Sequence, residues 1–150
     1  MILISLLLAL ASPKLAGTWT LVSVVNIRAD GSRVEPYGEH PEGVLMFDDG
    51  GRYSIQIYRV GRARFASNDK GRGTDSENRA VVQGSNTHCG RYGVGGDIIT
   101  FRIEHASFPN WEGTEQQRSF RLNADDLTYT VRTPTDGGAE TAEVTWRRAP

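Results

Sequence analysis

The chain has 150 residues, about the usual size of one domain, and its 17 Lys and Arg residues nearly balance its 18 Asp and Glu residues. This balance argues against a general nucleic-acid-binding protein, and 38% hydrophobic residues are too many for a disordered chain and too few for a polytopic membrane protein. The single cysteine, Cys89, excludes an internal disulfide and a multi-cysteine zinc site.

Residues 1–11, MILISLLLALA, are apolar at all positions but one. A helix needs about 20 apolar residues to cross a bilayer, so we expect no stable membrane span. The run matches the hydrophobic region of a signal peptide, with the small residues Ala9 and Ala11 at its end, although no Lys or Arg precedes it. It predicts secretion or export to the periplasm, with residues 12–150 as a single domain. The alternative is a buried N-terminal helix of a cytoplasmic protein.

The remaining chain is typical of short strands, rich in Val, Ile, Thr and aromatic residues and separated by turn signals such as Asp48-Asp49-Gly50-Gly51. We expect eight strands, at residues 17–27, 43–47, 52–58, 87–94, 97–105, 114–122, 127–133 and 139–147. One short helix interrupts them. Thr74-Asp75-Ser76-Glu77 forms a capping box, and the helix should run to Gln83.

Eight sequential antiparallel strands favour an up-and-down β-barrel, because closure removes exposed strand edges. An open sandwich is the structural alternative. An eight-stranded barrel is wide enough to hold one small ligand. Residues 59–72, just before the helix, hold five basic residues against one acidic residue. They are either a solvated loop or a charged rim that attracts anionic ligands.

Gly17-Thr18-Trp19 resembles the GxW signature of lipocalins, in which the Trp closes one barrel end and an Arg of the last strand packs over it. Trp146-Arg147-Arg148 offers such an Arg. Further segments, in chain order, are similar to the bacterial and fungal lipocalin-like domain family: LAGTWTLVS, GVLMFDDGGRYSIQIYR, FAS, GRYGV and FPNWEGTEQQR. The resemblance covers residues 15–148. It implies a calycin-type barrel with an internal pocket for a small apolar molecule, and some barrels of similar build act as cyclases or isomerases.

Arg118 is the most informative polar residue of the strand expected at 114–122. It shares a face with Gln116, Phe120 and Leu122, and the apolar face should point inward. A buried charge needs a partner. Arg118 therefore forms an internal salt bridge, lies at the open barrel end, or anchors a ligand carboxylate or carbonyl with its planar guanidinium.

Phe101 and His105 are candidates on the strand expected at 97–105, where strict alternation places both on the inner face. The resemblance implies a His at the position of Phe101, so any chemical role of that His has been lost or moved in this chain. His105 is the candidate for acid–base work, with Arg118 stabilising developing negative charge. The structural alternative is a His105 with no role in a site.

Three further aromatic residues, Tyr58, Tyr92 and Trp111, are candidates for the wall of the ligand pocket. Trp111 lies in a loop and either walls the ligand entry or packs under the barrel end. His88 shares a face with Tyr92 and could meet it in the pocket. The histidines are scattered and no phosphate loop or nucleophile elbow is present, so we expect no metal and no cofactor.

Three functions remain open. The first is a binding protein that holds an apolar or amphipathic small molecule inside the barrel, with no nucleic-acid partner. The second is a cofactor-independent cyclase, isomerase or dehydratase that uses the same pocket, with His105 and Arg118 as catalytic candidates. The third is a filled barrel that serves as an interaction module.

Overall fold

The computed structural model describes residues 14–135 and 138–150, so the export signal predicted at residues 1–11 lies outside the described residues. Eight strands of the described chain form one antiparallel barrel, and a two-residue strand, β2 (Arg33–Val34), pairs with the end of β1. The barrel strands are β1 (Gly17–Ile27), β3 (Glu42–Phe47), β4 (Arg52–Tyr58), β5 (Ser85–Gly95), β6 (Ile98–Ala106), β7 (Glu115–Asn123), β8 (Asp126–Arg132) and β9 (Thr141–Arg148).

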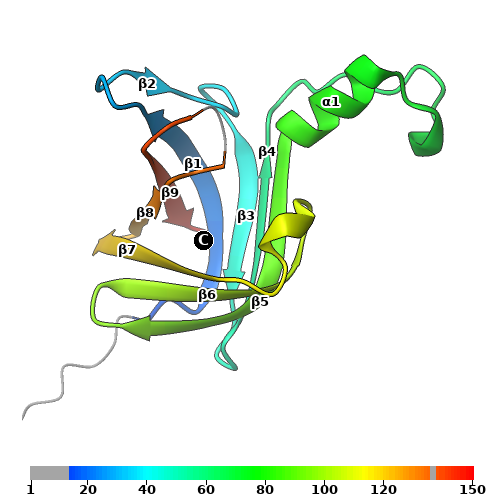
Figure 1. Ribbon diagram of the computed structural model, residues 1–150. Helices are drawn as coiled ribbons and strands as arrows, with labels where there is room; N and C mark the ends of the chain where they lie inside the picture. The colour runs from blue at the N-terminus through cyan, green and yellow to red at the C-terminus, as the bar shows by residue number, and fades with distance from the viewer. Residues whose placement is uncertain (1–13, 136–137) are drawn as a thin grey trace, which may run out of the picture.

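Neighbours in the chain are neighbours around the barrel, and the circle closes where β1 pairs with β9 (Figure 1). This last ladder runs from Trp19↔Arg148 to Ile27↔Thr141. Consecutive strands are joined by tight hairpin turns or by longer connections, and all the strand pairs are antiparallel. The predicted up-and-down barrel is confirmed, and the sandwich alternative is wrong.

Large apolar and aromatic side chains fill the barrel interior. They come from the inner face of each strand, as the two-residue alternation of a strand requires. Eight of them are less than 2% exposed: Trp19, Trp146, Tyr129, Phe101, Leu45, Ile55, Ile99 and Leu127. Full burial of one such side chain contributes about 1.5–3 kcal/mol, so this core is the main source of stability.

Trp19 closes the lower end of the barrel, where the chain enters β1. Its indole Nε1 donates to the Leu15 carbonyl oxygen at 2.9 Å. The guanidinium of Arg148 lies 4.1 Å from the indole ring centre and donates to the carbonyl oxygens of Ala16 and Lys14, each at 3.1 Å. The expected Trp–Arg stack is present, and it fixes the N-terminal segment across this end.

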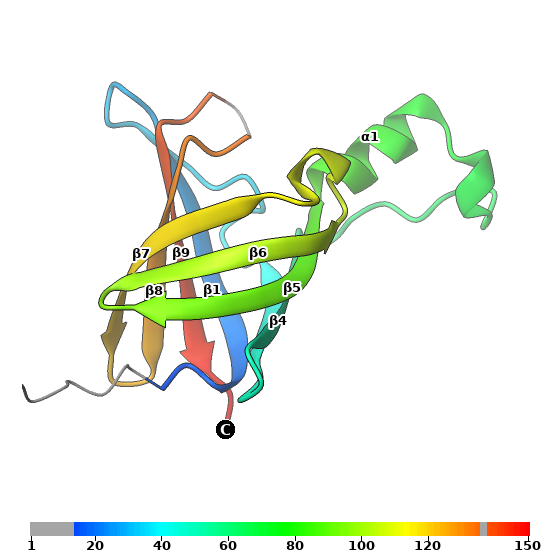
Figure 2. The same cartoon turned by 60° about the horizontal axis from the view of Figure 1, so that its bottom comes forward.

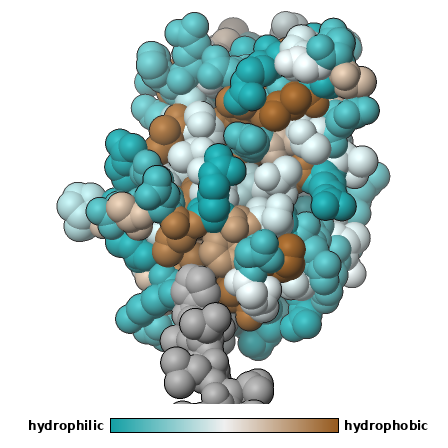
Figure 3. All heavy atoms as spheres, turned by 90° about the vertical axis from the view of Figure 1, so that its left-hand side faces the viewer, coloured by the Kyte–Doolittle hydropathy of each residue, from teal (hydrophilic) through white to brown (hydrophobic). Residues whose placement is uncertain are grey.

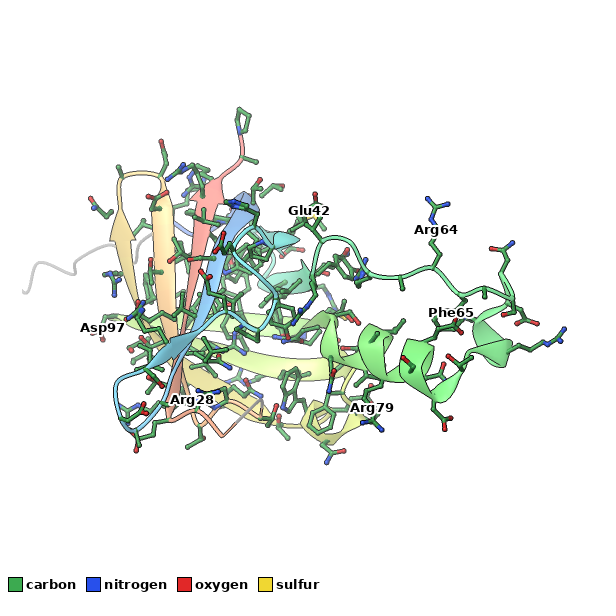
Figure 4. The ribbon with its side chains drawn as sticks, turned by 90° about the horizontal axis from the view of Figure 1, so that it is seen from above. Arg28, Glu42, Arg64, Phe65, Arg79 and Asp97 are labelled. Atoms are coloured by element: carbon green, nitrogen blue, oxygen red, sulfur yellow. The ribbon has the colours of Figure 1, made fainter. Side chains whose placement is uncertain are left out.

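The connection between β4 and β5, residues 59–84, projects from the barrel as an arm (Figures 1 and 2). It carries the predicted helix, α1 (Asp75–Gln83), with the capping box of Thr74 and Glu77 formed. Seen from above, Phe65 lies between the arm's loop and α1 (Figure 4). No residue of α1 is buried, so the helix does not plug the barrel. Within the described residues, no helix has both the length and the apolar character needed to cross a membrane.

Candidate functional site

Arg118 lies inside the barrel, where alternation along β7 places it. Its side chain is buried, with 6% of the residue exposed. The guanidinium carbon lies 4.7 Å from the ring centre of Phe101 and 4.8 Å from that of Tyr129. Aromatic rings therefore contact the cation from β6 and from β8, and such contacts stabilise a guanidinium by about 0.5–2 kcal/mol each.

The hydrogen bonds of Arg118 are incomplete. Its Nη2 donates to Gln116 Oε1 at 2.8 Å, but its buried Nε has no acceptor among the described residues. None of the ion pairs in the described chain includes Arg118. The internal salt bridge that the sequence left open is therefore not found. A buried guanidinium without a counter-charge costs several kcal/mol, which the two rings offset only in part.

A hydrogen-bonded pair of Tyr53 and His88 also contacts Phe101. The Tyr53 hydroxyl and His88 Nδ1 are 2.8 Å apart, and the Tyr53 and Phe101 rings are 4.7 Å apart in an edge-to-face arrangement. Burial is the main cause, and the positive charge of Arg118 the second, of a His88 pKa well below its usual value. The His88 imidazole is therefore neutral. Burial raises the pKa of Tyr53, which keeps its hydroxyl protonated. The pair can therefore donate or accept hydrogen bonds without carrying charge.

Trp111 covers His88 at the upper end of the barrel. It belongs to the 3-10 helix η2 (Pro109–Trp111) in the β6–β7 connection. Its ring centre is 5.7 Å from that of His88, edge-to-face, and 5.4 Å from that of Phe108. Trp111 thus packs over the barrel end rather than lining an open channel.

Two other predicted pocket residues lie on the inner face. Phe101 is fully buried at the centre of the aromatic group and touches both Arg118 and Tyr53. Tyr92 is half-buried but lies toward the lower end, where its hydroxyl donates to the Asp48 carbonyl oxygen at 2.9 Å. Phe101 therefore belongs to the Arg118 site, whereas the Tyr92 hydroxyl is engaged elsewhere.

His105 does not point into the barrel, and the prediction that it shares the inner face of Phe101 is wrong. The β5–β6 register shifts at Glu104: Ile103 pairs with Gly90, but His105 pairs with Cys89. This bulge adds one residue to β6 and turns His105 outward, so that 80% of its side chain is exposed. Its Nδ1 lies 4.0 Å from Glu112 Oε1. His105 cannot act on a ligand held by Arg118.

Tyr58 also faces outward, so its predicted place in the internal pocket is wrong. The guanidinium of Arg62, from the arm, lies 4.4 Å from its ring centre. Tyr58 borders a groove of about 470 Å³ on the outer surface of β4, β5 and β6. Polar and apolar residues both line this groove: Ser54, Ile55, Gln56, Tyr58, Thr87, His88, Cys89, His105, Ala106 and Ser107.

The sequence matches a known family over almost the whole described chain. A profile of the family described as "lipocalin-like domain" matches residues 16–149. The chain belongs to the lipocalin-like domain family. None of the curated proteins compared with this lipocalin-like chain matches it.

Three solved structures are similar to this lipocalin-like chain at low sequence identity. A lipocalin-like protein from Bacteroides uniformis is 15% identical, with a TM-score of 0.48 over 90% of this chain and 98% of that one. A redesigned β-barrel is 15% identical, with a TM-score of 0.44 over 91% and 92% of the two chains. The fluorescent protein UnaG is 15% identical, with a TM-score of 0.39 over 90% and 97%. These likenesses concern the fold alone.

Tyr53 was not among the site residues predicted from the sequence, and His88 was predicted to meet Tyr92 rather than to lie beside Arg118. The signal was present for both. Alternation puts Tyr53 on the buried face of Ile55 and Ile57, and it puts His88 on the face of Gly90. What the sequence could not show is that β4, β5 and β7 bring these three side chains around one ring. Within residues 14–135 and 138–150, no three His, Cys, Asp or Glu side chains lie together as metal ligands.

Proposed function

We propose that this lipocalin-like barrel binds a small molecule through a carboxylate or a similar anionic group, with Arg118 as the anchor. The observation that carries the proposal is a buried guanidinium with an unpartnered Nε and no ion-pair partner in the described chain. Such a group is costly in the free protein. A ligand anion would supply the missing acceptor and the missing charge.

The environment of Arg118 favours a planar anion. Phe101 and Tyr129 contact the guanidinium, Gln116 accepts from Nη2, and Nε remains free. A carboxylate can accept two parallel hydrogen bonds from a guanidinium edge, and this geometry is stronger than a single bond. Gln116, which is half-buried, is the protein group that a ligand oxygen would replace.

The neutral Tyr53–His88 pair extends the site. Both groups lie beside Phe101, and neither brings a negative charge that would repel an anionic ligand. The rest of the inner wall is apolar. A ligand with one anionic end and an apolar body therefore fits this chemistry better than a sugar or a nucleotide, which need many polar partners.

The test uses two fluorescent probes with one ring system: anilinonaphthalenesulfonate (ANS), which carries a sulfonate, and phenylnaphthylamine, which does not. Arg118→Met should weaken ANS binding by about 10- to 100-fold, the loss of a hydrogen bond to a charged group. It should leave the binding of phenylnaphthylamine nearly unchanged. Arg118→Lys should give an intermediate affinity, because Lys keeps the charge but not the planar fork.

Arg102→Met provides the matched control, because Arg102 lies on the outer face with 65% of its side chain exposed. It should leave both affinities unchanged. Equal affinity of wild type and Arg118→Met for ANS would overturn the proposal. So would an equal loss for both probes, because that would indicate a general loss of the pocket rather than of an anion anchor.

A second candidate function rests on the Tyr53–His88 hydrogen bond. A neutral imidazole and a protonated phenol 2.8 Å apart can relay a proton to or from a bound molecule, while Arg118 stabilises negative charge on it. This would support cofactor-independent isomerisation, cyclisation or dehydration. Tyr53→Phe would then abolish turnover of a bound metabolite and leave its affinity intact. Chemically unchanged ligand recovered after incubation would favour binding alone.

A further inference from the structure

The barrel wall beside Arg118 lacks one part of its hydrogen-bonded ladder. β7 and β8 pair from Asn123↔Asp126 to Phe120↔Tyr129, and there the pairing stops although both strands continue. The next two pairs in this register would be Ser119 opposite Thr130 and Arg118 opposite Val131, and neither is formed. The two upper halves thus have no backbone hydrogen bonds to one another in the described register.

The unpaired part of each strand still pairs with the strand on its other side. The upper part of β7 stays with β6, from Ile98↔Ser119 to Arg102↔Glu115, and the upper part of β8 stays with β9. Figure 2 shows β7 turning away from β8 beyond the part where the two strands pair. Figure 3 views this side of the molecule, where hydrophobic side chains come to the surface among hydrophilic ones. We call the unpaired region between residues 116–119 and 130–132 the lateral seam.

Arg118 lies directly behind the lateral seam. It is two residues beyond the last β7–β8 pair and contacts Tyr129, the β8 member of that pair. Val131, across the seam, is half-buried and packs against the core, and Gln116 is half-buried above. Side chains, rather than a backbone ladder, therefore close the wall next to the free Nε of Arg118.

The upper end of the barrel is closed more firmly. Trp111 packs on His88, and His88 is hydrogen-bonded to Tyr53. The segment that carries Trp111 is held by Gly113 N–H to the Ile103 carbonyl oxygen at 2.9 Å and by the Thr114 hydroxyl to the Trp111 carbonyl oxygen at 2.7 Å. A ligand arriving from this end would have to displace the Trp111 ring from His88, whereas a rotation of Val131 or Gln116 breaks no backbone ladder.

We infer that the anionic ligand reaches Arg118 through the lateral seam, with Val131 and Gln116 as the side chains that open and close it. This inference rests on the proposed anion site at Arg118. Local opening at a seam without backbone hydrogen bonds needs less disruption than opening at the paired strands around it. Gln116 couples the opening of the seam to the binding of the ligand. Its side chain lines the seam, and it also accepts the hydrogen bond from Arg118 Nη2 until a ligand oxygen replaces it.

The test measures association and dissociation rates of ANS by stopped-flow fluorescence. Val131→Ala should raise both rates, and Val131→Trp should lower both by about tenfold, within the range of one to three decades seen among variants of one interface. Because a barrier on the path changes both directions equally, the dissociation constant should stay nearly constant. Arg121→Trp is the control: it adds the same side chain on the outer face of the paired part of β7, where 66% of the Arg121 side chain is exposed, and should change neither rate.

Trp111→Ala separates the two routes. If ligands use the lateral seam, removing the Trp111 side chain leaves both rates as in wild type. Faster rates in Trp111→Ala, or unchanged rates in both Val131 variants, would overturn the inference even if Arg118→Met still weakens ANS binding. Failure of the anion site gives a different result, namely an ANS dissociation constant that does not depend on Arg118. If Val131→Trp does not fold, Val131→Ala decides.

Discussion

Replacing Arg118 with methionine should make the ligand-free protein more stable while it weakens anion binding. Methionine keeps the unbranched apolar stem between Phe101 and Tyr129 and removes the charge. An ordinary structural arginine would behave in the opposite way. The sign of the stability change therefore separates an arginine that serves the fold from one that serves a ligand.

The magnitude follows from the contacts of Arg118. The variant loses two ring contacts of about 1 kcal/mol each and one hydrogen bond from a charged donor, worth about 1.5–3 kcal/mol. It also removes the unpartnered Nε, about 1–3 kcal/mol, and the burial of an uncompensated cation, which costs several kcal/mol. The net expectation is a gain of about 1 kcal/mol, or about 2–4 °C in Tm for a chain of this length.

Urea and thermal unfolding of the ligand-free protein, followed by circular dichroism, would measure this change. Arg148→Met is the matched comparison: Arg148 also lies over an aromatic ring, but both its Nη atoms donate to backbone carbonyls and it is half-exposed. That variant should lose about 1–2 kcal/mol. A loss of more than about 1 kcal/mol in Arg118→Met would refute the reasoning, because the guanidinium would then be satisfied in the free protein.

Three further outcomes are expected. Burial holds the pKa of His88 well below its usual 6.5, so below that pH the unfolded chain binds a proton that the folded chain does not. The free energy of unfolding should therefore fall by up to about 1.4 kcal/mol per pH unit as the pH drops below 6.5, and urea unfolding at two pH values should show this fall in wild type but not in His88→Gln. Tyr53→Phe leaves Nδ1 of His88 without its partner and should cost about 1–3 kcal/mol in urea unfolding, whereas no loss would mean that another donor replaces the hydroxyl. Thr74→Ala removes a helix cap but touches no buried residue, so hydrogen exchange should speed up in α1 while Tm stays constant; a fall in Tm would show that the arm supports the barrel.

The strands and the helix could be predicted because their signals are local. Turn residues such as Asp48-Asp49-Gly50-Gly51 end one strand and begin the next, and the capping box at Thr74 marks the start of α1. Alternation then gave the correct face for Arg118 and Phe101. Closure into a barrel followed from the number and order of the strands, and it agrees with the resemblance carried by the GxW motif.

The errors in the site have a physical cause. Alternation holds only while no residue is added, and the bulge at Glu104 reverses the face of His105. One hint lay on the partner strand: a Cβ at Gly90 would lie 2.1 Å from the Arg102 carbonyl oxygen, and a glycine inside a strand marks such a close approach. The prediction that Tyr58 lines the internal pocket failed for another reason: alternation along this strand already placed Tyr53 inside and Tyr58 outside.

The two ring-stacked arginines show why the sequence alone cannot assign the site. Arg118 and Arg148 both lie on strands and both contact aromatic rings. They differ in burial and in how their donors are satisfied. Arg148 is half-exposed, and its Nη1 and Nη2 donate to backbone carbonyls of a segment 132 or more residues away in the chain. Arg118 is buried, and its Nε meets no acceptor in the described chain. Whether a carbonyl reaches a guanidinium across the barrel is decided by closure, not by local pattern. A buried arginine with an unpartnered hydrogen-bond donor is therefore a stronger indication of a ligand site than the position of an arginine in a sequence motif.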